Sequence, residues 1–173
     1  MMCSSLLGLW LVGTLEFGAL LGGAMPFGNL ESNLQGGNAF QIVLGYGLGR
    51  SRLELTNDFT RLPGSTQPAY LLDIHRISLG YGLAVLYRPD WEVRAGLHLG
   101  WNTLTRRLQE ASETGAVPGA VLDLTYTQQL GRPKFLCRLF GIELVDPGSN
   151  RASPSAFGAT VLGAGIGVGY ELF

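Results

Sequence analysis

Two histidines are the residues of this sequence whose types and neighbours could support catalysis. His98 lies four residues from both Arg94 and Asn102, and His75 lies three residues before Ser78. Hydrolysis or transfer of an acyl group needs a nucleophile, a base and a group that orients the base. His98, with polar neighbours on both sides, is therefore the better candidate for a base.

Neither histidine completes a catalytic set. Residues three apart in an extended strand point to opposite faces, which separates His75 from Ser78 unless the strand is irregular there. A single histidine among polar side chains is more often part of a hydrogen-bond network. The two cysteines, Cys3 and Cys137, have no metal-binding spacing. We therefore expect no catalytic residue, no metal site and no cofactor.

The segment that carries His98 alternates between two kinds of side chain. In WEVRAGLHLGW (91–101) every odd position is apolar, and every even position is charged, polar or glycine. This period of two is typical of a β-strand and excludes a helix. The same alternation is found in segments 39–49, 77–87, 120–127 and 160–172, and more weakly in 14–25, 50–59 and 134–145. The sequence therefore predicts eight strands.

Two irregularities are expected in these strands. Arg138 and Glu143 have opposite parities within segment 134–145, which predicts a bulge or a different strand boundary there. A second change of parity lies between Ile74 and Ile77, just before segment 77–87.

The predicted connections alternate between short and long. The links after the second, fourth and sixth strands are tight turns at 49–51, 88–90 and 130–133, whereas the links at 26–38, 60–69, 107–119 and 146–156 are long and polar. In an up-and-down meander, alternate links lie at the same end. One end of the sheet should therefore carry short turns and the other long loops.

Composition decides which solvent the apolar face meets. The chain has 46% hydrophobic and 14% charged residues, 26 glycines and a single lysine, Lys134. A strand face in water would carry Lys, Glu, Thr and Gln, whereas glycine suits the narrow interior of an eight-stranded barrel. We therefore predict an all-β, eight-stranded antiparallel up-and-down transmembrane β-barrel with its apolar face towards lipid. A soluble lipocalin-like barrel that binds a hydrophobic ligand, with the apolar face as its core, is the alternative architecture.

Charged side chains share the inward parity with the glycines. Inside a narrow barrel they would be desolvated and would need partners of opposite sign. The predicted interior polar network consists of Glu16, Arg52, Glu54, Glu92, Arg94, His98, Asp123 and Glu171.

Large aromatic side chains mark both ends of the apolar face. Trp91 and Trp101 are ten residues apart on the outward parity, which corresponds to roughly 25 Å along the axis of a tilted barrel. That is the height of a lipid-facing band with an aromatic residue at each interface. Tyr87 and Tyr170 lie near the end with short turns and complete the predicted aromatic girdle.

The chain ends in GVGYELF, which resembles the C-terminal assembly signal of bacterial outer-membrane β-barrels. Gly167, Tyr170 and Leu172 match its internal positions and Phe173 its terminal aromatic residue, while Glu171 departs from the pattern. With the loop asymmetry, residues 14–173 resemble the small OmpA/OmpX-type barrels. The resemblance implies the bacterial outer membrane, insertion by the outer-membrane assembly machinery, short turns in the periplasm, long loops outside and no appended domain.

We expect a structural role, or a role in surface interaction through the long loops. The protein should be a porin-like monomer surrounded by membrane lipid, and the sequence does not specify a partner for its loops. A net charge of −1 gives no sign of a nucleic-acid-binding surface, and eight strands are too few for an open pore.

A lipid A-modifying enzyme is the alternative function, although the sequence has no His-x-Ser-Asn arrangement like that of lipid A deacylases. The apolar run within residues 1–13 is too short for a membrane-spanning helix and is consistent with a remnant of an export signal.

Overall fold

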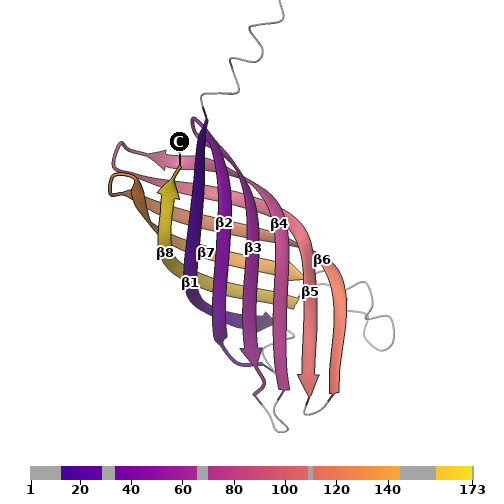
Figure 1. Ribbon diagram of the computed structural model, residues 1–173. Helices are drawn as coiled ribbons and strands as arrows, with labels where there is room; N and C mark the ends of the chain where they lie inside the picture. Colours follow the sequence, from indigo (N-terminus) through magenta and orange to yellow (C-terminus); the bar gives the residue numbers. More distant parts are fainter. Residues whose placement is uncertain (1–12, 29–33, 66–69, 109–110, 145–158, 173) are drawn as a thin grey trace, which may run out of the picture.

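The computed structural model describes residues 13–28, 34–65, 70–108, 111–144 and 159–172, and within them the chain forms eight antiparallel strands (Figure 1). The strands are β1 (Thr14–Gly28), β2 (Gly37–Leu48), β3 (Ser51–Pro63), β4 (Tyr70–Tyr87), β5 (Trp91–Leu108), β6 (Ala111–Gln129), β7 (Pro133–Leu144) and β8 (Ala159–Glu171). Each strand pairs with the next, and β8 pairs with β1, so the sheet closes into a barrel. The predicted fold class is confirmed. No helix in these residues is long and apolar enough to cross a membrane.

Two predicted segments lie outside the described residues. They are the apolar run within 1–13, of which only Gly13 is described, and the long link at 146–156. Both stay predictions.

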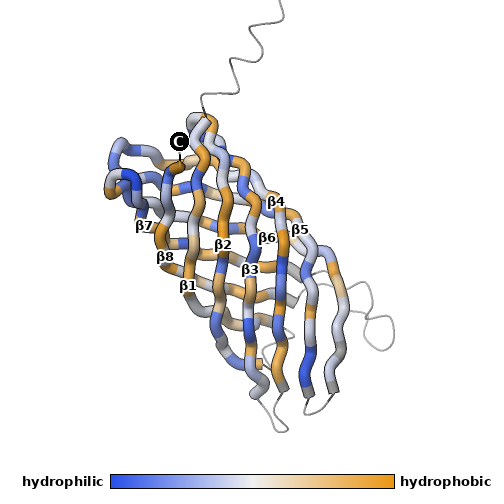
Figure 2. Tube along the Cα trace, in the orientation of Figure 1, coloured by the Kyte–Doolittle hydropathy of each residue, from blue (hydrophilic) through white to orange (hydrophobic). Residues whose placement is uncertain are grey.

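The apolar side chains of the strands point outward and the polar ones inward. In β5, Leu97, Leu99 and Trp101 are at least half exposed, whereas Arg94 and His98 are buried. Figure 2 shows hydrophobic and hydrophilic residues alternating along the strands. A soluble barrel would bury its apolar face as the core, so this arrangement argues against the lipocalin-like alternative.

Short turns gather at one end of the barrel, together with the start of β1 and the end of β8 (Figure 1). Gly49 and Gly131 lie in two of these turns with φ of 62° and 101°, a left-handed conformation that glycine adopts without steric cost. The predicted short turns are therefore confirmed at this end of the barrel.

One predicted long loop is wrong. Residues 107–119 were expected to form a polar link, but β5 and β6 remain paired from Trp101↔Pro118 up to Leu108↔Ala111. A strand pair that extends beyond the apolar band has water on both faces, so its sequence needs no alternation and resembles a loop. β4 likewise begins at Tyr70, before the predicted segment 77–87.

The predicted irregularities are also wrong in position. β7 pairs without a register shift from Lys134 to Leu144 on both sides, and β4 is regular between Ile74 and Ile77. The shift lies instead between Ala84 and Leu86, and it turns the Leu86 side chain outward although its parity predicted an inward one.

A hydrophobic cluster fills the barrel at the long-loop end and explains the change of parity near Ile74. Inward-facing positions there are apolar instead of polar, so sequence alternation stops while the strand continues. The largest members of the cluster are Leu34, Leu62, Leu72, Ile74, Leu104, Phe140 and Ile142.

Candidate functional site

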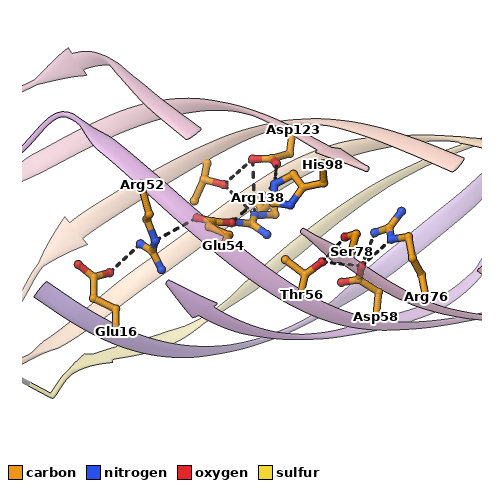
Figure 3. Close-up of polar contacts among 11 residues, drawn as sticks. Glu16, Arg52, Glu54, Thr56, Asp58, Arg76, Ser78, His98, Asp123 and Arg138 are labelled. Carbon is orange, nitrogen blue, oxygen red and sulfur yellow. Dashed lines mark hydrogen bonds and ion pairs between the residues drawn. The ribbon is translucent and has the colours of Figure 1, made fainter. Parts of the chain in front are cut away.

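The barrel interior brings the predicted polar residues together near the short-turn end. Glu16 accepts a hydrogen bond from Arg52 (Nη1 to Oε2, 2.6 Å), and Arg52 also lies 3.1 Å from Glu54 (Figure 3). Arg94 pairs with Glu92 at 2.9 Å. Because each of these charges has a partner of opposite sign, the ion pairs offset the cost of burying them.

His98 lies halfway along this network. Its Nε2 is 2.6 Å from Oδ2 of Asp123 and 3.7 Å from Oε2 of Glu54. Arg138 donates hydrogen bonds from Nη2 to Glu54 (2.6 Å) and from Nε to the Thr125 hydroxyl (2.8 Å). The eight residues predicted for the interior network thus share one interior with their counter-charges.

Among the side chains that the structure describes, four charged members of the interior were missed. Lys134 and Arg138 come from β7, whose weak alternation hid their inward direction. Asp58 and Arg76 form a second ion pair closer to the hydrophobic cluster, with a hydrogen bond from Arg76 Nε to Asp58 Oδ2 of 2.7 Å. Asp58 lies within the predicted segment 50–59, on the same parity as Arg52 and Glu54, so the alternation already indicated its inward direction.

Glycines make room for the large interior side chains. A Cβ added at Gly80 would lie 2.1 Å from Nδ1 of His98, and one at Gly45 would lie 2.1 Å from Nε of Arg52. A Cβ added at Gly163 would likewise clash with the Phe140 ring. The prediction that glycine occupies the inward face because space is short is consistent with each of these contacts.

Among the described residues, the interior has a small mouth at one end and a tightly filled middle. A cavity of about 400 Å³ opens at the short-turn end beside Glu16, Glu92, Lys134 and Glu171. Further in, the space between Arg76, His98, Arg138 and Phe140 has no room for a water molecule. The hydrophobic cluster then closes the far end.

The catalytic alternative finds little support in this geometry. His98 is 3% exposed, and its Nδ1 has no hydrogen-bond partner among the described residues. His75 points outward and bonds Asn57 (Nε2 to Oδ1, 2.7 Å), whereas Ser78 points inward and bonds Thr56 (2.6 Å). No group of three or more potential metal ligands occurs in the described part of the chain.

The four residues predicted for the aromatic girdle lie at the ends of the apolar face, and their place in a bilayer stays a prediction. Trp101 and Tyr170 are exposed on the outer wall. Tyr87 is exposed too, but the register shift beyond Ala84 sets it opposite Glu92 on the inward face, where it lines the mouth of the interior cavity. Its predicted outward direction is therefore wrong. Trp91 is half-buried, with its ring 6.2 Å from that of Tyr126.

The strand that carries the predicted assembly signal closes the barrel. In β8, Tyr170 pairs with Phe17 and Gly167 with Leu20 of β1, and Leu172 donates a backbone hydrogen bond to Leu15. Phe173 lies outside the described residues. Its part in the signal stays a prediction.

Solved structures with the same architecture are known. Neisserial surface protein A (NspA) matches with a TM-score of 0.70 and 13% identity over 91% of this chain and 97% of that one. A major outer membrane protein from Thermus thermophilus matches with a TM-score of 0.61 and 12% identity over 93% and 100%. The N-terminal β-barrel domain of Pseudomonas aeruginosa OprF matches with a TM-score of 0.53 and 13% identity over 92% and 99%.

No protein-family model matches the sequence, and neither does any curated protein sequence. The structural likeness shows that the chain has the fold of the small eight-stranded outer-membrane β-barrels, which confirms the fold that the resemblance predicted. The bacterial outer membrane is the location that this fold indicates.

Proposed function

We propose that the chain is a monomeric, membrane-embedded outer-membrane barrel without catalytic activity, whose long-loop end binds partners outside the bilayer. The membrane part of the proposal is supported by the wall itself. On its outer face, Leu79 and Leu99 are 64% exposed and Ile166 is 61% exposed. Contact with lipid favours such side chains, whereas contact with water does not. A closed barrel also satisfies its backbone hydrogen bonds within the bilayer.

The observation that carries the interaction role is the extension of β6 beyond its neighbour β7. Within the described part of the chain, residues 111–118 of β6 pair with β5 alone, because pairing with β7 begins at Gly119↔Leu144. Pro118, which has no backbone N–H to donate, stands at this boundary, a position that suits an unpaired strand edge. Exposed residues Ser112, Thr114 and Ala116 follow along the extension. An unpaired strand edge can accept an extended peptide from a partner.

Shortening the β5–β6 hairpin tests the interaction role. Residues 105–114 would be replaced by a tight Asn-Gly turn, which removes the outer half of the extension and leaves the strands of the apolar band intact. Cells that display the shortened barrel should bind immobilised extracellular proteins less than cells that display the full chain. Equal binding by both, with equal amounts of folded barrel, would contradict the role.

A His98→Ala variant tests the absence of catalysis. If the chain modifies lipid A, loss of the best-placed base should abolish that modification in cells while the barrel still folds. We expect the lipid A of cells with the variant and with the unchanged chain to be the same by mass spectrometry. A modification present only with the unchanged chain would favour the enzyme instead.

A further inference from the structure

Beyond the apolar band, towards the long-loop end, two arginines on the outer wall form ion pairs with one carboxylate. Arg61 of β3 donates to Asp73 of β4 from Nε (2.7 Å) and Nη2 (3.2 Å). Arg107 of β5 reaches the same carboxylate with Nη2 at 3.3 Å. None of these three residues belongs to the interior network.

The carboxylate of this cluster is covered, and the two guanidinium groups are exposed. The Asp73 side chain is 6% exposed, whereas those of Arg61 and Arg107 are 47% and 55% exposed. Two arginines and one aspartate leave the cluster with a net charge of +1. Its exposed surface is formed by the two guanidinium groups. The Phe59 ring, 5.5 Å from Cζ of Arg61, holds that guanidinium against the wall.

The cluster lies next to the lipid-facing surface of the same strands. Along β4, Asp73 is followed on the outward side by His75 and then by Ile77, about 13 Å away along the strand. Ile77 pairs with Trp101 of β5, and both are more than half exposed. A ligand that contacts both surfaces must therefore be anionic at one end and apolar at the other.

We propose that Arg61 and Arg107, held by Asp73, bind the phosphate of a membrane lipid headgroup while its acyl chains lie against the wall near Ile77 and Trp101. Arginine suits this role because its guanidinium donates paired hydrogen bonds to phosphate oxygens. The contact with the apolar wall favours a lipid over a free phosphate ion. The proposal rests on the membrane location given under the proposed function.

Native mass spectrometry of the full chain refolded in detergent micelles tests the site. The probes are phosphatidylglycerol and phosphatidylcholine with the same acyl chains, which differ in headgroup charge. We expect the unchanged barrel to retain phosphatidylglycerol preferentially, by about five- to tenfold. Equal retention of the two lipids would overturn the proposal.

Three variants locate the preference. The neutral triple variant Arg61→Gln/Asp73→Asn/Arg107→Gln leaves no unpaired carboxylate and should lose the preference. Asp73→Asn alone keeps both arginines and should retain phosphatidylglycerol at least as well as the unchanged chain. Arg132→Gln, which removes an exposed arginine at the short-turn end, should have no effect. A preference that survives the triple variant, or disappears with Arg132→Gln or with Asp73→Asn, would contradict the site.

Two further measurements separate the possible causes of failure. Inorganic phosphate in large excess should not displace the bound phosphatidylglycerol, and complete displacement would indicate a site for a soluble anion instead of a lipid. Refolding with and without micelles reports on the membrane location itself. A barrel that folds only with micelles but shows no lipid preference would refute the headgroup site and leave the proposed function intact.

Discussion

Glu16 and Glu171 lie directly opposite each other across the seam between β1 and β8, where the first and last strands close the barrel. Two like charges in this position repel each other. Lys134 of β7 lies between them, with Nζ 2.5 Å from Oε1 of Glu16 and 3.1 Å from Oε2 of Glu171. The single lysine of the sequence therefore holds three strands together at the point of closure.

Lys134→Met should weaken this seam. It leaves Glu171 facing Glu16 without a cation between them, and we expect the free energy of unfolding to fall by about 2 kcal/mol. Urea unfolding in micelles, followed by circular dichroism and by the shift of unheated gel bands, measures the change. Adding Glu171→Gln to the variant removes the repulsion and should restore part of the stability. An unchanged midpoint in the single variant would show that the seam does not depend on Lys134.

Gly80→Ala should disturb the middle of the interior network. The new methyl group would lie 2.1 Å from the His98 ring, so the ring must shift from its place beside Asp123, at a cost of about 1–3 kcal/mol. Gly115→Ala is the matched control, because a Cβ there meets nothing within 4 Å. The same unfolding experiment compares the two. Similar stabilities would indicate that the interior is less tightly filled than these contacts imply.

Trp101 should report the depth of the barrel in a bilayer. With Trp10 and Trp91 replaced by phenylalanine, Trp101 is the one remaining tryptophan of the sequence. Its place at the boundary of the apolar band predicts strong fluorescence quenching by lipids brominated near the headgroup and weak quenching by lipids brominated near the chain ends. The opposite order would place Trp101 in the middle of the bilayer and contradict the assigned band.

The barrel should not conduct ions in a planar bilayer. The space around His98 and Arg138 has no room for a water molecule, and the cluster around Leu62 and Ile74 closes the long-loop end. Recordings of the unchanged chain should show a flat baseline after insertion, with detection of the folded barrel in the same membrane as the control. Regular single-channel steps would mean that the interior opens.

Much of the fold could be predicted because strand alternation is a local property. The parity of 91–101 put Trp101 and His98 on opposite faces, composition indicated that Trp101 faces outward, and the structure places both side chains in this way. The eight strands and the short-turn end followed from the same period and from turn residues such as Gly49 and Gly131. These features depend on neighbours in the sequence, so they can be read from it directly.

The tertiary structure decided what depends on residues far apart in the chain. Lys134 meets Glu16 across 118 positions, and only the closure of β8 onto β1 brings them together. The extension of β5 and β6 depends on pairing beyond the apolar band, where alternation gives no signal. Asp73 likewise has its two arginines because β3 and β5 both flank β4. Sequence alternation separated the two faces of most strands and composition assigned them to lipid and interior, whereas strand pairing and register determined which charges meet.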